Sequence, residues 1–338
     1  AGLLIVTVRR ATKSGQEYVT LSEISQLSQA LESYKAKHGG YPPSFGIDPN
    51  FRAYYNLPLK RQRAMYHIRS AYPRYAGTVK DINAYVSAHF QTPSGTPMYT
   101  DNIDAAEALV VWLGGGPDPE SGSKVMGFGA ESGSPFVHRD DEPQRTSPFF
   151  DFDPARLVDR DGDGWWEYLP PNSDLAVGPP YVYFDHTIYD GRPTYPHDAY
   201  QDAIPTAPWR PNQEAVLTTS DTGGSVGEWG VAVPYARTSS DVDTDDARIG
   251  WLMPDTYQII AAGGDGSYGR DENYADGAMA FVNVRTIDVA NDIWSPVPTL
   301  EKAQTKDPLV GFYAGDFDNL TNFHGGTLED MVAEVAAE

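Results

Sequence analysis

The chain of 338 residues contains no cysteine. This absence excludes a disulfide framework, a thiolate metal site and a cysteine nucleophile. It does not decide the compartment, since a surface protein without cysteine can use calcium in place of disulfides. Long apolar runs are also missing. The longest, Ala1 to Val8, is closed by Arg9 and Arg10 and falls short of the roughly 20 residues that a membrane span needs. We expect neither a spanning segment nor a signal peptide in this sequence.

Basic residues are scarce: 25 Lys and Arg stand against 47 Asp and Glu, which gives a net charge of −22. Binding to nucleic acid or to anionic lipid is therefore not expected. The charge is uneven, because residues 1–90 hold twelve basic and five acidic residues while the remainder carries −29. Two interpretations stay open. In the first, the acidic residues form a solvated surface that keeps a secreted protein soluble. In the second, the basic N-terminal part of one copy attracts the acidic remainder of another copy.

A long N-terminal helix is the clearest predicted element. Residues 11–37 contain no proline and one glycine. Apolar residues recur every three or four positions, and Glu23 and Glu32 occupy the other faces. The apolar positions are Leu21, Ile24, Leu27, Leu31 and Tyr34. Gly39-Gly40 supplies a stop, and a helix that reaches back to Ala1 would be about 55 Å long.

The remainder of the chain indicates short strands and loops. Gly and Pro are abundant, at 32 and 27 residues. A buried helix is expected within residues 104–116, which have an acidic first turn and a glycine stop. Short strands are expected at 180–184, 230–233, 257–261 and 278–284. A small antiparallel sheet packed on the long helix gives an α+β fold.

An acidic loop between residues 159 and 167 is the sharpest chemical motif. Carboxylates at alternate positions, with Gly164 allowing a tight turn, bring oxygens together around a hard cation of the size of calcium. Counted from Asp159, an EF-hand would need glutamate at the twelfth position, where Pro170 stands. Glu167, at the ninth position, is therefore the candidate that completes the coordination of the ion. The predicted ligands are Asp159, Asp161, Asp163 and Glu167. The alternative is a solvated acidic turn.

Two motifs carry a resemblance to a known family. The first is the segment Ala1-Gly-Leu-Leu-Ile-Val together with the helix that ends in Lys37-His-Gly-Gly-Tyr-Pro-Pro43. The second is the Gly264-Asp-Gly266 turn followed later by Asp316-Phe-Asp-Asn-Leu-Thr-Asn-Phe323. They resemble type IV pilins, and most closely the major pseudopilins of type II secretion. The resemblance covers residues 1–45 and 251–323. The sequence differs from the family pattern at its start. The short leader, the aromatic first residue and the glutamate at the fifth place of the family pattern are missing.

The resemblance implies a pilin-like fold in which residues 1–40 form a filament-core helix and residues 41–338 form the extracellular head. Residues 50–250 are then a large insertion, and 251–323 hold the C-terminal sheet and a calcium loop. It implies Asp265 as one Ca²⁺ ligand, with the second either Asp318 or Asn319. About a dozen apolar residues would precede Ala1. The implied partners are other copies of the chain and the inner-membrane assembly machinery. The implied location is a cell-surface filament or a periplasmic pseudopilus.

Enzyme motifs are weak. Residues 264–269 match a dinucleotide-binding glycine pattern, but no helix is expected after them and Asp265 would repel a pyrophosphate. Residues 223–227 match a nucleophile elbow without a strand before them. We therefore expect no enzyme. The alternative is a calcium-dependent surface adhesin or carbohydrate-binding protein with Trp165, Trp166 and Trp209 exposed. A secreted glycoside hydrolase is a further, weaker alternative. Its two catalytic carboxylates are brought together by the fold, so the sequence alone does not reveal such a pair.

Overall fold

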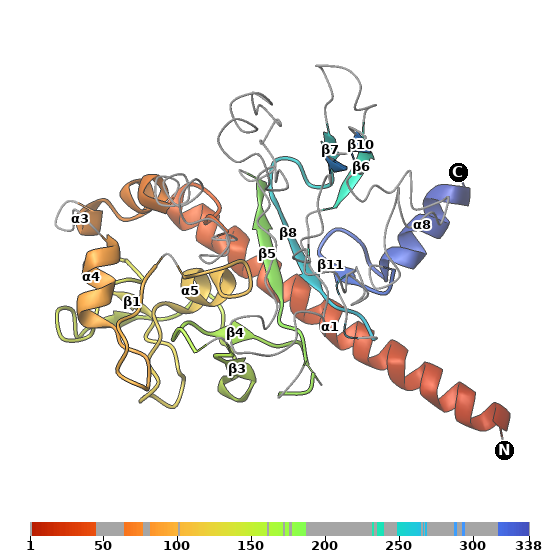
Figure 1. Cartoon of the computed structure of the whole chain (residues 1–338), viewed down its shortest axis with the longest axis horizontal. Coiled ribbons are helices and arrows are strands. Elements are labelled where there is room, and N and C mark those ends of the chain that lie inside the picture. Colours follow the sequence, from red (N-terminus) through yellow and green to blue (C-terminus); the bar gives the residue numbers. More distant parts are fainter. Residues whose placement is uncertain are drawn as a thin grey trace.

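The computed structural model describes residues 2–44, 64–76, 82–100, 102–160, 162–171, 173–175, 178–186, 232, 235–239, 249–264, 266, 268, 287–288, 293–294 and 317–337. These residues form one long helix, α1 (Gly2–His38), a head of short helices and small antiparallel sheets, and a helix near the C-terminus, α8 (Leu328–Ala337) (Figure 1). The expected α+β class is therefore confirmed.

Helix α1 is continuous over 37 residues, which confirms the helix predicted at 11–37 and extends it back to Gly2. Its C-terminal half crosses the head, and its N-terminal end projects beyond it (Figure 1). The helix stops at Gly39, which adopts the left-handed conformation (φ 85°) and donates its N–H to the Lys35 carbonyl at 2.7 Å. Lys35 and Lys37 in the last turn favour the negative end of the helix dipole. Within the described chain, no helix has the length and apolar content needed to cross a bilayer.

The buried face of α1 differs from the predicted one at two positions. Ile24, Leu27, Leu31 and Tyr34 are buried, as their spacing predicts. Leu21 is only partly buried. Glu23, which the pattern placed on a polar face, is 9% exposed and points into the head. The interpretation of Glu23 as a surface residue is wrong, because its carboxylate has partners on the head, which are described below.

A three-stranded antiparallel sheet packs across α1. Its order is β11-β8-β5, with β5 (Val182–Asp185), β8 (Tyr257–Ala261) and β11 (Leu320–Thr321). Tyr183 pairs with Ile259, and Leu320 pairs with Ala261. The predicted strand at 257–261 is confirmed, and the one at 180–184 is β5, shifted by two residues at its start. The strand predicted at 278–284 lies outside the described residues, as does most of that at 230–233.

The remaining elements are short. Four strand pairs are antiparallel: β1 (Phe128–Gly129) with β2 (Arg145–Thr146), β3 (Leu157–Val158) with β4 (Glu167–Tyr168), β6 (Ala236–Ser239) with β7 (Ile249–Trp251), and β9 (Ile287–Asp288) with β10 (Ile293–Trp294). The shorter helices are 64–71, α3 (Pro73–Ala76), α4 (Ile82–His89), α5 (Ala108–Gly114) and the 3-10 turn η2 (Pro154–Arg156).

The two faces of the three-stranded sheet belong to two hydrophobic clusters. Alternate side chains of a strand point to opposite faces. Tyr183 and Ile259 lie in the large cluster, which includes α1 and α5, whereas Phe184 and Ile260 lie in a smaller cluster with Leu328 of α8. Helix α5 is wholly buried, which confirms the predicted buried helix. The larger cluster therefore joins α1 to the head.

Candidate functional site

The first acidic loop connects the two strands of a hairpin. Strands β3 and β4 pair in register, Leu157 with Tyr168 and Val158 with Glu167, so residues 159–166 form the loop between them. Gly162 (φ 77°) and Gly164 (φ 97°) adopt the left-handed conformation that glycine tolerates best. A Cβ at position 164 would lie 2.6 Å from the Met98 sulfur, so the Met98 side chain would have to move.

Two of the predicted ligands shape this turn. Asp159 Oδ1 accepts a hydrogen bond from Gly162 N at 2.9 Å, and Asp163 Oδ1 accepts one from Trp165 N at 2.9 Å. Such side-chain-to-backbone bonds hold acidic turns in place without a ligand. Asp161 lies outside the described residues. The fourth predicted ligand, Glu167, is buried on β4. Burial lowers the pKa of Arg160, and the negative charge of Glu167 opposes that shift, so this carboxylate acts on a cation of the loop itself.

The two tryptophans of the loop serve packing. Trp165 is fully buried, and its indole N–H donates to the Tyr99 carbonyl at 2.9 Å. Trp166 is partly buried, donates to the Lys124 carbonyl at 2.9 Å and carries the Lys124 ammonium 4.9 Å from its ring centroid. The prediction that Trp165 is an exposed stacking residue is wrong, because the hairpin turns its ring into the core. Trp209 lies outside the described residues.

The second acidic loop has its two halves together, although they are some fifty residues apart. Antiparallel pairing of β11 with β8 brings Asp318 beside Gly263, where a Cβ would lie 2.4 Å from Asp318 Oδ1. Asn319 is buried, and its Oδ1 accepts from Gly263 N at 3.3 Å. Its Nδ2 donates to the Tyr235 hydroxyl at 2.8 Å and to the Tyr268 carbonyl at 3.2 Å. Asn319 therefore ties three segments of the head together. Asp265 lies outside the described residues.

The two loops approach one another at Tyr268. Burial raises the pKa of the Tyr268 hydroxyl, the negative charge of Glu167 raises it further, and the positive charge of Arg160 opposes these effects. The charges of Glu167 and Arg160, at the first loop, thus influence the pKa of Tyr268, which follows the second loop. The sequence did not indicate this proximity.

Metal-ligand geometry is not seen in the described part of the chain, where no group of three or more His, Asp or Glu side chains is arranged to hold a metal ion. That part lacks one predicted ligand of each loop, Asp161 and Asp265. The donors of both loops are oxygens, the kind that Ca²⁺ prefers. Calcium binding therefore stays a prediction for both loops.

A buried ion pair fixes α1 to the head, and the sequence analysis missed it. Glu23 Oε2 accepts from Arg156 Nη1 at 2.8 Å and from the Tyr181 hydroxyl at 2.9 Å. Glu23 Oε1 accepts from the Tyr168 hydroxyl at 3.0 Å and from Arg156 Nη2. We call these four residues the Glu23 pin. Tyr168 belongs to the hairpin that carries the first acidic loop, and Arg156 directly precedes that hairpin, so the loop is coupled to α1.

The charge of Glu23 dominates the electrostatics of the pin. Burial alone lowers the pKa of Arg156, but the hydrogen bonds and charge of Glu23 outweigh it and raise the pKa overall. Burial raises the pKa of the Tyr181 hydroxyl, and the Glu23 carboxylate raises it further. Arg156 is therefore charged, and Tyr168 and Tyr181 are neutral, over the physiological pH range.

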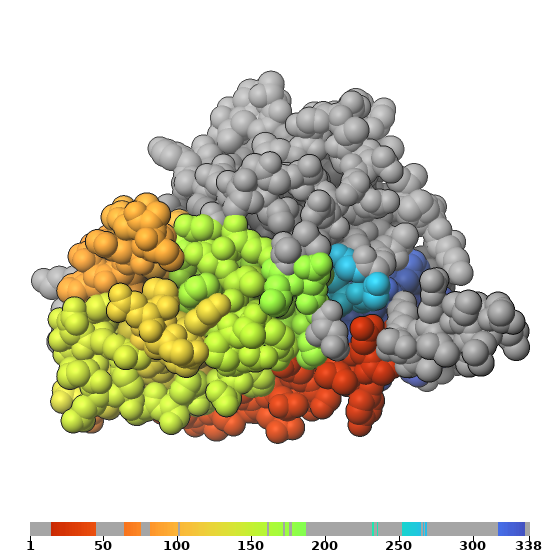
Figure 2. Space-filling view, turned by 90° about the horizontal axis from the view of Figure 1, so that it is seen from below, coloured from red at the N-terminus to blue at the C-terminus, as the bar shows by residue number. Residues whose placement is uncertain are grey.

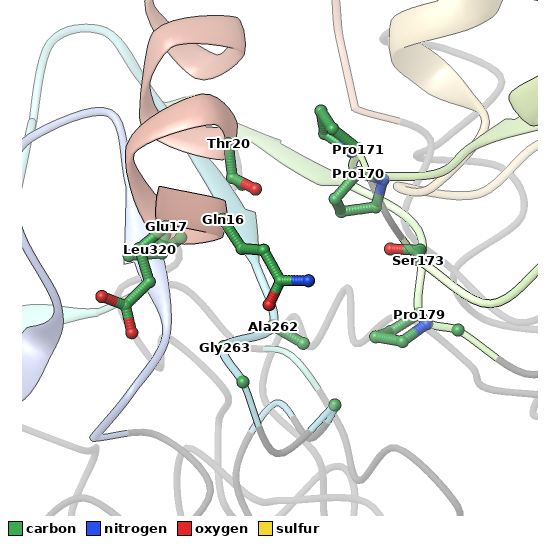
Figure 3. Close-up of a pocket in the computed structure, with 13 residues that line it drawn as sticks. Gln16, Glu17, Thr20, Pro170, Pro171, Ser173, Pro179, Ala262, Gly263 and Leu320 are labelled. Atoms are coloured by element: carbon green, nitrogen blue, oxygen red, sulfur yellow. The ribbon is translucent and has the colours of Figure 1, made fainter. Parts of the chain in front are cut away.

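A pocket of about 260 Å³ opens where α1 leaves the head. Gln16 and Thr20 extend from α1 toward the wall that holds Pro170, Ser173 and Pro179 (Figure 3). Ala262, Gly263, Gly264 and Gly266 of the second loop also line it. Among the lining residues that the structure describes, Glu17 is the titratable one.

Comparisons with known proteins give no relative. No protein-family model, no curated protein and no solved structure matches the chain. The function is therefore inferred from the chain itself.

Proposed function

We propose that the protein is a structural subunit, a pilin or pseudopilin, that assembles with copies of itself through α1 into an extracellular or periplasmic filament. The observation that carries the proposal is the division of α1. One face of its C-terminal half is buried in the head, while the helix continues without a break beyond the head (Figure 1). A helix of about 55 Å is far longer than this head needs to complete its core.

The solvent side of α1 supports the proposal. Between positions 18 and 29 its exposed residues are Tyr18, Val19, Ser22, Ser25, Gln26 and Gln29. We call them the outer face of α1. None is charged, although the chain carries −22 overall, and Tyr18 is 75% exposed. The described side chains of α1 lie along one edge of the head (Figure 2). Acidic copies can approach along this edge without like-charge contacts.

The spacing on the outer face suits a second helix. Tyr18, Ser22, Ser25 and Gln29 follow one another at intervals of four, three and four residues. This repeat keeps side chains on one line of a helix and lets helices pack along their length. Serines at the middle of the line permit close approach of the two backbones. The partner implied is α1 of another copy.

The Glu23 pin gives the proposed assembly a rigid connection. A filament subunit must transmit force between its core helix and its head. Four hydrogen bonds to one buried carboxylate, from three head residues, resist rotation of α1 in its seat. In our proposal Ca²⁺ bound at the two acidic loops stiffens the same hairpin and the adjacent sheet edge, as the resemblance to pseudopilins implies.

The test changes the outer face without touching the core. Ser25→Arg places a long cation in the line of contact between helices, and we expect filaments to disappear. Ser70→Arg is the matched control, because Ser70 is also an exposed helical serine but lies in the head. Cells producing each full-length variant are examined by electron microscopy with an antibody against the head. Both variants should unfold within about 0.5 kcal/mol of the wild type.

Two results would contradict the proposal. Filaments of Ser25→Arg that match the wild type in number and length would remove the outer face from the interface. Wild-type label on the cell envelope without filaments would contradict polymerisation itself and favour a surface adhesin.

A further inference from the structure

Two partly buried histidines from separate segments meet in one aromatic cluster, in which Tyr34 and Tyr72 are buried. His38 ends α1, and its ring centroid lies 4.5 Å from that of Tyr34 and 4.8 Å from that of Tyr72. His67 belongs to helix 64–71, and its ring centroid lies 5.8 Å from that of Tyr34 and 5.2 Å from that of Trp112 in α5. We call Tyr34, His38, His67 and Tyr72 the histidine joint. It joins the end of α1 to residues 64–72.

The hydrogen bonds of His67 require a neutral ring. The Tyr34 hydroxyl lies 2.8 Å from His67 Nε2 and 2.6 Å from the Tyr72 hydroxyl. All three groups are satisfied when Tyr72 donates to Tyr34 and Tyr34 donates to the lone pair of Nε2. A proton on Nε2 would reverse this chain. The Tyr72 O–H would then need another acceptor, and the described residues give it none.

His38 is also placed as a neutral ring. Its Nδ1 lies 3.2 Å from the Ala71 carbonyl, which can only accept, so Nδ1 carries the hydrogen. Its Nε2 is buried and has no hydrogen-bond partner among the described residues. A proton there would create a buried N–H without an acceptor, which is costly.

No described carboxylate compensates a positive charge in the joint. Burial and, to a smaller extent, the charge of His38 together lower the pKa of His67 to about 4. Burial lowers the pKa of His38, the Ala71 carbonyl opposes that shift, and Lys37 of α1 adds to it. The side chain that faces His67 from α5 is Trp112, and the one that faces His38 from the segment before η2 is Phe149. Neither carries a charge.

We propose that the histidine joint is an acid-sensitive connection: when its histidines take up protons, residues 64–72 separate from the end of α1. The closed form excludes the proton because it offers neither an acceptor nor an anion, whereas solvent offers both to the open form. The joint is closed at neutral pH and opens in an acidic medium. This device is independent of self-assembly through the outer face.

The sign of the effect follows from the direction of the shift. A histidine whose pKa is lower when the joint is closed binds fewer protons in that state, so closure weakens as the pH falls below 6.5. The loss levels off below about pH 4, the pKa of His67 in the closed form. For His67 alone, the equilibrium constant for opening rises about a hundredfold between pH 7 and pH 4.

Amide hydrogen exchange of the full chain, corrected for the intrinsic effect of pH, measures the opening. In the wild type we expect protection of residues 64–72 to fall about a hundredfold from pH 7 to pH 4. In His67→Gln, which keeps an acceptor for Tyr34, we expect most of this fall to vanish. His89→Gln is the matched control, because His89 lies in α4 outside the joint, and it should behave as the wild type.

A second measurement covers the case in which His67→Gln fails to fold. Ring-proton resonances of the wild-type histidines are titrated by NMR, and two of them should titrate below the ordinary value of about 6.5. If all wild-type histidines titrate near 6.5, or if His67→Gln loses protection as the wild type does, the proposal is overturned.

Discussion

The two halves of α1 share a helix but differ in what surrounds them. In residues 20–38 one face is covered by the sheet, α5 and the β3–β4 hairpin, and it contains both apolar side chains and the Glu23 pin. The N-terminal half continues as a helix past the head (Figure 1). At the boundary, Tyr18 and Val19 are exposed, whereas Thr20, one residue further, is buried.

This difference separates stability from assembly. A helix in water gains most of its stability from a packed face, so the C-terminal half is held by the head. A projecting half without packing partners would gain little, and in our proposal neighbouring copies supply the contacts. We expect substitutions in the packed half to unfold the subunit and substitutions on the outer face to leave it folded but unassembled.

The largest expected effect compares two tyrosines of the same helix. Tyr34 is fully buried and Tyr18 is 75% exposed. Tyr34→Ala removes a core ring together with the hydrogen bonds of the histidine joint, and should cost about 4 kcal/mol of unfolding free energy. Tyr18→Ala should change it by less than about 0.5 kcal/mol. Denaturant unfolding of the two variants measures both values, and equal losses would contradict the division of α1.

The second effect compares two glutamates of α1. Glu23→Ala leaves Arg156 buried without its carboxylate partner, and should cost about 3 kcal/mol. Glu32 is exposed and accepts one hydrogen bond, from the Tyr41 hydroxyl at 2.6 Å. Glu32→Ala should therefore cost about 1 kcal/mol.

A double-mutant cycle identifies the source of the Glu23 effect. If the loss comes from the pin, Arg156→Met combined with Glu23→Ala costs less than the sum of the two single changes. Additive losses would show that Glu23 acts through helix propensity or packing and not through Arg156.

The sequence predicts local features well and long-range pairings poorly. Residues 11–37 of α1, its glycine stop, the buried α5 and the strand at 257–261 follow from periodicity and stop signals within short windows. Each of these depends on residues close in sequence or on a pattern of known spacing.

Glu23 and Trp165 show why the sequence did not reveal which polar and aromatic side chains are buried. Glu23 stands four residues before Leu27, on the same side of the helix, and that position was the available signal of burial. Its partner Arg156 is 133 residues away, so no window along the chain reveals the pair. Trp165 follows an acidic turn, which favours exposure, but the β3–β4 pairing turns the ring inward. In both cases tertiary contacts overrode a local polar signal.

The last comparison concerns calcium and sets the two acidic loops against each other. If each loop binds Ca²⁺, the ion stabilises the folded head by about 2.7 kcal/mol at a free concentration one hundred times its dissociation constant. Asp163→Ala and Asp265→Ala should each remove that gain for their own loop. In excess chelator, Asp265→Ala should match the wild type.

The two loops should nonetheless respond differently in chelator. Asp163 also holds the hairpin turn through Trp165 N, so its loss should cost about 1 kcal/mol even without calcium. Thermal unfolding of the wild type and both variants, with calcium and with chelator, separates the two contributions. A variant whose loss of stability is the same in both buffers does not affect calcium binding, and that loop is then an acidic turn held by its own hydrogen bonds. Because the first loop lies in the hairpin that contacts Glu23, calcium there should also slow hydrogen exchange in α1 around residue 23, whereas calcium in the second loop should act on β8 and β11.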